Sequence, residues 1–267
     1  MVEEESKGLT FAPQLLRDVF GVGTSCPGCG EQIGLKISLQ VLGKCVLVNS
    51  DGSMALLAKY PKTSFNVPYV NCGLNAAATA SALSRYSSNV ILVYAGDAAT
   101  LMHLDSLIAA AYHGDNFIYV CYNNKGFGSV DHSYRQEKSI ASSIALHAVY
   151  TATASIAYPE DFVTKLRKAA ALQGVKFIEI LTPCPATWKF DPSITIEVAR
   201  LAVESGVWPL YEVENKKVVL TKRPSRLEPI DRYLSLQKRF SFTDEEKNVI
   251  QETAKRNYKL LSEGKLA

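Results

Sequence analysis

The sequence predicts an α/β protein with a doubly wound, mostly parallel sheet, followed by a C-terminal hairpin and a helical extension. Four short runs are rich in Val, Ile, Phe and Tyr and are apolar through most of their length, as strands buried on both faces are. Segments with helical character separate these runs, and regular alternation of strand and helix is typical of parallel βαβ units. The four strands are expected at residues 45–48, 90–94, 117–122 and 175–180.

The expected helices lie between these strands. The first spans residues 31–42. Its apolar residues Ile33, Ile37 and Val41 recur every four positions, which favours a helix with one buried face. Three more helices, the first of them rich in alanine as suits close packing on a sheet, are expected at residues 74–83, 101–112 and 159–172.

The pattern changes beyond about residue 185, after a turn at Thr182-Pro-Cys-Pro185. A short helix is predicted at residues 194–204. Two apolar runs, residues 210–213 and 218–221, flank a polar tetrapeptide and favour a β-hairpin.

A helical tail is predicted from Thr243. Thr243 and Glu246 stand at the spacing of a capping box, in which two side chains satisfy the first backbone N–H groups of a helix. We expect one domain over residues 1–267, with a core at about 20–185 and a C-terminal extension at about 186–267.

The composition excludes several classes of function. The 267 residues are 47% hydrophobic, enough for a sizeable core, and the net charge of +3 is small. Basic residues are spread along the chain, so no nucleic-acid footprint is indicated. The acidic N-terminus has no apolar h-region, and the sequence has no run of about 18 apolar residues that could span a membrane. We therefore expect a cytoplasmic protein with no nucleic-acid or membrane partner.

Polar residues follow two of the expected strands. Asp97 comes just after one strand, and Asn124 comes just after the next strand along the chain. The carboxyl ends of parallel strands share one edge of the sheet, where ligands of such folds bind. Mg²⁺ prefers oxygen ligands and usually keeps water and phosphate among them. We therefore predict that Asp97, Asn124 and the backbone carbonyl of Gly126 hold one Mg²⁺ with its diphosphate.

Small residues surround Asp97. Gly96 is expected to let the backbone turn, and the N–H groups of Ala98 and Ala99 are expected to donate to phosphate. Each half of the pattern alone is more often an ordinary loop, because Gly-Asp and Asn-Asn are common in turns. Taken together, Gly96-Asp97 and Asn123-Asn124 resemble the thiamine diphosphate (TPP) motif, in which Ala98 replaces a glycine.

A second candidate site is a set of cysteines. Cys26-Pro-Gly-Cys29 precedes the first expected helix, and a C-x-x-C pair with turn residues between can hold a metal ion or an iron–sulfur cluster. A zinc site and a redox dithiol are the competing interpretations of this motif alone. Cys184 follows the last expected parallel strand, which places it at the same edge of the sheet as the diphosphate site.

Three motifs together resemble those of one enzyme family. They are Cys26-Pro-Gly-Cys-Gly30, the pair Gly96-Asp97 and Asn123-Asn124, and Thr182-Pro-Cys-Pro-Ala-Thr-Trp188 followed by Asp191-Pro192. The chain resembles the β subunit of 2-oxoacid:ferredoxin oxidoreductases, of the pyruvate or branched-chain 2-oxoacid type, as a divergent member. The likeness runs from about residue 26 to the C-terminal helix.

The resemblance implies a fold, a chemistry and a set of partners. The sheet would be that of the TPP-binding diphosphate domain. TPP and Mg²⁺ would support oxidative decarboxylation of pyruvate, or a related 2-oxoacid, to acyl-CoA and CO₂, and a [4Fe–4S] cluster in this subunit would pass electrons toward ferredoxin. The partners would be an α subunit with the pyrimidine domain, a γ subunit and a ferredoxin-like δ subunit. The activating glutamate would come from the α subunit, so we assign no catalytic residue to this chain.

The sequence departs from the family at the cluster. The family's cluster has four cysteine ligands in this subunit, and Cys26, Cys29 and Cys184 correspond to three of them. The fourth position falls near Ser53-Met54. A hydroxyl and a thioether are both poor substitutes for a thiolate on iron.

A further departure lies in the loop after Asn124. Ser129 stands where the family has an asparagine that approaches the cofactor and the substrate, and we keep Ser129 as a candidate cofactor contact. His132 and Arg135 could face the 2-oxoacid or CoA, although a solvated loop is the simpler interpretation. Two alternatives therefore stay open: a TPP-binding subunit without a functional cluster, such as a non-oxidative decarboxylase, and a non-catalytic paralogous subunit.

Overall fold

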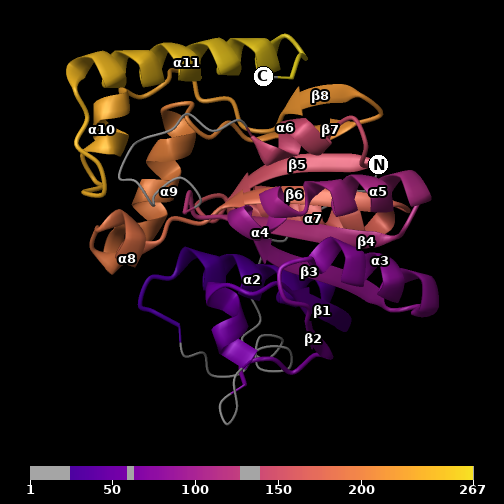
Figure 1. Cartoon of the computed structure of the whole chain (residues 1–267). Coiled ribbons are helices and arrows are strands. Elements are labelled where there is room, and N and C mark those ends of the chain that lie inside the picture. The colour runs from indigo at the N-terminus through magenta and orange to yellow at the C-terminus, as the bar shows by residue number, and fades with distance from the viewer. Residues whose placement is uncertain (1–24, 59–62, 127–138, 267) are drawn as a thin grey trace, which may run out of the picture.

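The computed structural model describes residues 25–58, 63–126 and 139–266, which surround one eight-stranded sheet (Figure 1). The strand order is β2-β1-β3-β4-β6-β5-β7-β8. Every pairing from β2 through β5 is parallel, whereas β7 pairs antiparallel with β5 and β8 antiparallel with β7. The strands are β1 (Cys45–Asn49), β2 (Tyr69–Asn71), β3 (Val90–Gly96), β4 (Phe117–Asn123), β5 (Tyr150–Ser155), β6 (Val175–Leu181), β7 (Tyr211–Glu214) and β8 (Lys217–Leu220).

Helices cover both faces of this sheet (Figure 1). No helix within the described ranges combines the length and the apolar character that crossing a membrane requires. The α-helices are α2 (Gly30–Leu42), α3 (Ala76–Tyr86), α4 (Asp97–Met102), α5 (Leu104–His113), α6 (Ile140–Ile144), α7 (Pro159–Ala171), α8 (Pro185–Trp188), α9 (Thr195–Glu204), α10 (Ile230–Leu234) and α11 (Asp244–Ser262). Two 3₁₀ helices are η1 (Ser53–Ala58) and η3 (Pro192–Ile194).

Two apolar layers flank the sheet. One lies against α2 and α7 and includes the buried side chains of Leu35 and Phe162. The other lies against α3, α5 and α6 and includes Leu107 and Ile144. A sheet buried on both faces is what near-continuous apolar strands predict, so the doubly wound α/β fold is confirmed.

The four expected strands are confirmed as β1, β3, β4 and β6, but β2 and β5 are strands that the sequence pattern does not predict. Strand β5 reads Tyr-Thr-Ala-Thr-Ala-Ser and therefore shows no apolar run, yet all of its residues are buried. Thr153 is accommodated there because its Oγ1 donates to the carbonyl of Pro209 at 2.7 Å.

One expectation about the helices is wrong, and another is confirmed only in part. The helix predicted at residues 101–112 is two helices, α4 and α5, because His103 between them leaves the helical conformation with φ −130°. In α2 the buried stripe runs through Leu35 and Leu39, together with the neighbouring Gly34 and Ser38. Of the predicted apolar face, Ile37 is buried, whereas Ile33 is only partly buried.

The C-terminal hairpin is confirmed as β7 and β8. Its two turn residues, Asn215 and Lys216, have φ values of 49° and 62°, as a tight two-residue hairpin turn demands. The capping box is also confirmed, because Thr243 Oγ1 accepts from the N–H of Glu246 and the Glu246 carboxylate accepts from the N–H of Thr243.

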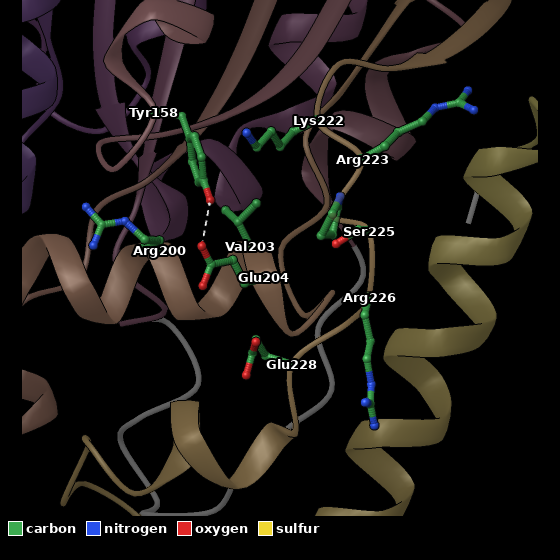
Figure 2. Close-up of a pocket in the computed structure, with 10 residues that line it drawn as sticks. Tyr158, Arg200, Val203, Glu204, Lys222, Arg223, Ser225, Arg226 and Glu228 are labelled. Carbon is green, nitrogen blue, oxygen red and sulfur yellow. Dashed lines mark hydrogen bonds between the residues drawn. The ribbon is translucent and has the colours of Figure 1, made fainter.

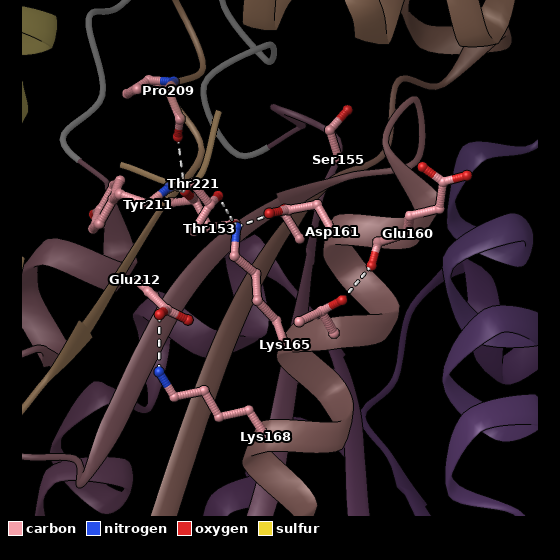
Figure 3. Close-up of polar contacts among 12 residues, drawn as sticks. Thr153, Ser155, Glu160, Asp161, Lys165, Lys168, Pro209, Tyr211, Glu212 and Thr221 are labelled. Atoms are coloured by element: carbon pink, nitrogen blue, oxygen red, sulfur yellow. Dashed lines mark hydrogen bonds and ion pairs between the residues drawn. The ribbon is translucent and has the colours of Figure 1, made fainter. Parts of the chain in front are cut away.

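Lys165 on α7 joins the hairpin to the parallel strands (Figure 3). Its side chain is 1% exposed, and its Nζ donates to the carbonyl of Thr153 at 2.8 Å, to Asp161 at 2.6 Å and to Thr221 Oγ1 at 2.8 Å. Burial lowers the pKa of Lys165, and the Asp161 carboxylate opposes that shift. One buried cation thus ties β5, α7 and the end of β8 together.

Candidate functional site

Asp97 brings the two halves of the predicted diphosphate motif together. It is the first residue of α4, directly after β3, and is 5% exposed. Its Oδ1 accepts from the N–H of Ala98 at 2.9 Å, and its Oδ2 accepts from the N–H of Gly126 at 3.1 Å. The second bond spans from the end of β3 to the loop after β4, as the parallel pairing of these strands requires.

Asn124 presents one oxygen without a protein partner. Its Nδ2 donates to Glu31 Oε1 at 2.7 Å, and its backbone carbonyl accepts from Trp188 Nε1 at 2.6 Å. Its Oδ1 is buried and meets no hydrogen-bond donor in the described ranges. A buried carbonyl oxygen of this kind costs free energy unless something binds it.

Gly126 completes the predicted oxygen set. A Cβ at Gly126 would lie only 2.5 Å from Asn124 Oδ1, so glycine is required for this close approach. Asp97, Asn124 and Gly126 therefore meet within one small volume, with a carboxylate and an unpaired amide oxygen among them. This donor set fits the hard oxygen ligands that Mg²⁺ prefers. The role of the Gly126 carbonyl stays a prediction.

Of the residues beside Asp97, Gly96 has a role other than the one expected. Gly96 has φ −74°, which any residue adopts, so the turn does not require glycine. Glycine is favoured there because a Cβ would lie 3.2 Å from the ring of Tyr122. The N–H of Ala98 is donated to Asp97, and Ala99 is buried at 5% exposure. Phosphate contacts from Ala98 and Ala99 stay predictions.

The loop after β4 is shaped by Asn123. Its Oδ1 accepts from the N–H of Lys125 at 2.8 Å, and Lys125 takes a positive φ of 55°. Its Nδ2 donates to the buried Glu179 at 2.8 Å. Asn123 therefore builds the turn, while Asn124 directs its side chain into the site.

Glu31 is a site residue that none of the sequence motifs indicates. It is 2% exposed, and its carboxylate accepts from Asn124 Nδ2 and from the hydroxyl of Ser53. Burial raises the pKa of Glu31, and these two hydrogen bonds oppose the shift. A usable signal exists in the sequence, because Glu31 stands one helical turn before Leu35 on the stripe of α2 that faces the sheet.

The cysteine loop lies against the turn that carries Cys184. A Cβ at Gly30 would lie 2.7 Å from the carbonyl oxygen of Pro183, so the two segments touch. Burial raises the pKa of Cys29 to about 11, and the negative charge of Glu31 adds to this effect. All six cysteines fall in the described ranges and carry free thiols.

The cysteines do not form a four-thiolate site. Within residues 25–58, 63–126 and 139–266, no group of three or more His, Cys, Asp or Glu side chains is placed to hold a metal ion. At the expected fourth position, Met54 is 2% exposed and packs in the apolar core, and Ser53 donates its hydroxyl to Glu31. These residues do not fit the ligand set of a [4Fe–4S] cluster.

Three sequence candidates lie outside the described residues. They are Ser129, His132 and Arg135, all in the segment 127–138. Their roles stay predictions.

A separate cavity of about 440 Å³ lies in the C-terminal extension (Figure 2). Its lining includes Tyr158, Arg200, Lys222 and Arg223. Lys222 Nζ lies 5.1 Å from the centre of the Tyr158 ring, whereas the guanidinium groups of Arg200 and Arg223 point to opposite sides in Figure 2. Because these cations do not converge, we assign the cavity no part in the diphosphate site.

Comparison with known proteins agrees with this geometry. The family model "Thiamine pyrophosphate enzyme, C-terminal TPP binding domain" matches residues 52–180. Pyruvate synthase subunit PorB of Methanothermobacter marburgensis is 39% identical over 263 residues, which cover 85% of this chain and 91% of that protein. The chain belongs to the β subunits of 2-oxoacid:ferredoxin oxidoreductases.

Other relatives of this β subunit are named for different substrates. Ketoisovalerate oxidoreductase subunit VorB of Pyrococcus horikoshii is 30% identical, and the match covers 91% of each chain. A solved 2-oxoglutarate:ferredoxin oxidoreductase from Magnetococcus marinus matches with a TM-score of 0.55 and 17% identity, covering 95% of the β subunit and 99% of that chain. This last likeness shows the fold alone.

Proposed function

We propose that this β subunit binds TPP and Mg²⁺ for a complex that oxidatively decarboxylates pyruvate, or a related 2-oxoacid, to acyl-CoA and CO₂, with ferredoxin as electron acceptor. The observation that carries the proposal is Asn124 Oδ1, a buried oxygen with no donor in the described ranges, next to Gly126 and Asp97. The matching family model supports the cofactor, and the names of the relatives support the substrate class.

The residues of this chain would bind and orient the metal. Asp97, Asn124 and the Gly126 carbonyl would supply three oxygen ligands, and phosphate and water oxygens would complete the octahedron. Bound TPP supplies the carbon nucleophile for the keto carbon of the 2-oxoacid. Glu31 accepts from the side-chain amide of Asn124, and Trp188 donates to the backbone carbonyl of Asn124. These two bonds fix the direction in which Asn124 Oδ1 points.

Several further contacts belong to the same proposal. Gly96, Ala98, Ala99 and Ser129 would lie along the cofactor, and an α subunit would contribute the activating glutamate. A γ subunit and a ferredoxin-like δ subunit would complete the complex. The names of the relatives as subunits support a multi-subunit assembly.

Replacing the charged metal ligand tests the proposal. Asp97→Ala removes the carboxylate from the metal site, so the affinity for TPP in the presence of Mg²⁺ should fall by at least roughly tenfold. Isothermal titration calorimetry of the αβ complex with TPP measures the change in affinity. Asp105→Ala, an exposed aspartate at the start of α5, is the matched control and should leave the affinity unchanged. An Asp97→Ala protein that binds TPP as the wild type does would refute the metal assignment.

A second candidate function is favoured by the cysteine geometry. A TPP-binding subunit without a cluster would catalyse a redox-neutral decarboxylation, in which a proton replaces CO₂ and the product is an aldehyde. The fourth ligand position, occupied by Ser53 and Met54, favours this alternative. Product analysis distinguishes the two, because aldehyde without reduced ferredoxin indicates the non-oxidative reaction. Failure of the wild-type complex to bind TPP would instead favour a non-catalytic subunit.

A further inference from the structure

Ser53 stands at the sequence position where the fourth cysteine ligand is expected. Glu31 stands two residues after Cys29 at the start of α2, and its carboxylate accepts the hydroxyl of Ser53 from the start of η1. Ser53 therefore lies near the start of α2, which directly follows the cysteine loop. The Cys184 turn lies against the same loop through the contact of Gly30 with Pro183.

The remaining thiols lie elsewhere. Cys45 is 1% exposed at the start of β1, the end of the strand opposite to η1. Cys121 is fully buried within β4. Cys72 follows the edge strand β2 and donates its thiol hydrogen to the carbonyl of Asn49 at 3.2 Å. Cys45 and Cys121 are thus fixed within strands, and Cys72 is held by its bond to Asn49.

The side chain of Ser53 is engaged by the neighbouring site. Its hydroxyl binds one oxygen of Glu31, and the other oxygen of Glu31 binds the amide of Asn124. This chain of hydrogen bonds leads from the cysteine loop to the proposed Mg²⁺ ligand. A serine oxygen is also a hard ligand, whereas iron–sulfur clusters are held by soft thiolates.

We infer that this β subunit does not hold a four-thiolate [4Fe–4S] cluster, and that Ser53 occupies the place of the absent fourth ligand as part of the hydrogen-bond chain Ser53–Glu31–Asn124. The first half of the inference stands on the cysteine geometry alone. The second half rests on the proposed function, because it assigns Asn124 to the metal of TPP.

Installing a cysteine tests the inference. The full β subunit, in complex with its partner chains and purified without oxygen, is treated with iron and sulfide, and the same is done for Ser53→Cys. Iron and acid-labile sulfide are compared with those of the partner chains alone. The wild-type subunit should add no stable cluster, whereas Ser53→Cys should add about four irons and four sulfides, as one [4Fe–4S] cluster requires. Ala55→Cys, a half-buried neighbour on η1, is the matched control and should add none.

Each outcome decides the matter. A wild-type subunit that adds about four irons with matching sulfide overturns the inference. A Ser53→Cys protein that adds no more iron than Ala55→Cys shows that Ser53 is not at the fourth position. TPP titration of the same preparations tests the proposed function separately. If the wild-type complex does not bind TPP, the proposed function is refuted, but the iron analysis keeps its meaning.

Discussion

At the scale of single residues, some members of the diphosphate site can be recognised from a sequence motif, whereas others can be recognised only from the packing of the folded chain. Asp97 and Asn124 are recognisable from the sequence because each follows a predicted strand, and the structure brings their loops together. Glu31 is not recognisable in that way, because its partner Asn124 lies 93 positions away in the chain. The sequence pattern predicts a buried face through Ile37 but leaves out the buried stripe of Leu35 and Leu39, on which Glu31 lies, so the pattern does not indicate the buried carboxylate.

Glu31 positions Asn124, and two substitutions test this role. Glu31→Ala frees the amide to rotate, so TPP affinity in Mg²⁺ should fall by roughly tenfold or more, as for other groups that orient a metal ligand. Glu31→Gln keeps an oxygen that accepts from Asn124 Nδ2 and should retain most of the affinity. Titration of TPP against both variants measures the difference. Equal losses in the two variants would show that the charge of Glu31, and not its hydrogen bond, is what matters.

At the scale of secondary-structure elements, composition predicts strands only when they are apolar. The four apolar strands are recognisable from the sequence. Strand β5 is not, because it is buried although its sequence alternates Thr and Ala. Polar side chains inside the sheet are tolerated when another element satisfies them, as Pro209 does for Thr153. Such partners come from the C-terminal extension, which the pattern of one strand cannot reveal.

Lys176 near the start of β6 makes an element-scale prediction about pH. It is 3% exposed, its Nζ donates to Asn116 Oδ1 at 2.6 Å, and burial lowers its pKa to about 8. In the unfolded chain the pKa is about 10.4. Between these values the unfolded chain binds more protons than the folded chain, so the Lys176 contribution makes stability rise with pH from about 8 to about 10.4.

Removing this amine should stabilise the protein below pH 8, where the buried charge carries its full cost. Lys176→Met should raise the free energy of unfolding at pH 7 by on the order of 2 kcal/mol, and the gain should shrink toward pH 10. Urea denaturation of both proteins at the two pH values measures it. A variant that is less stable than the wild type at pH 7 would show that the bond to Asn116 outweighs the cost of burial.

At the scale of the whole molecule, the C-terminal extension holds the diphosphate loop. Trp188 is fully buried and donates to the carbonyl of Asn124, and Arg239 donates to the carbonyl of Lys125 at 3.2 Å while its guanidinium lies 3.9 Å from the centre of the Trp188 ring. The prediction of a single domain is untested, but the pairing of β7 with β5 and these two bonds support it.

Two tryptophans allow a matched test of this support. Trp188→Phe leaves the Asn124 carbonyl without its donor, which should cost about 1–3 kcal/mol of stability and should also weaken TPP binding in Mg²⁺. Trp208→Phe removes a similar bond, from Nε1 to the carbonyl of Ala154 at 2.8 Å, and keeps an aromatic ring beside Lys125, whose Nζ lies 5.1 Å from the centre of the Trp208 ring. It should lower stability by a similar amount with TPP affinity unchanged. Thermal unfolding and TPP titration give the two readouts, and equal TPP losses would contradict the assigned role of Trp188.

The bonds from Trp188 and Arg239 also join the loop to residues that are synthesised much later. The donor to the Asn124 carbonyl lies 64 residues later in the chain, and the donor to the Lys125 carbonyl lies 114 residues later. A nascent chain that has emerged only as far as the parallel strands therefore contains every predicted metal ligand and the loop's partners Glu31 and Asp97, but lacks the two donors Trp188 and Arg239. We therefore expect the proposed cofactor site to reach its final geometry only after residue 239 has been synthesised.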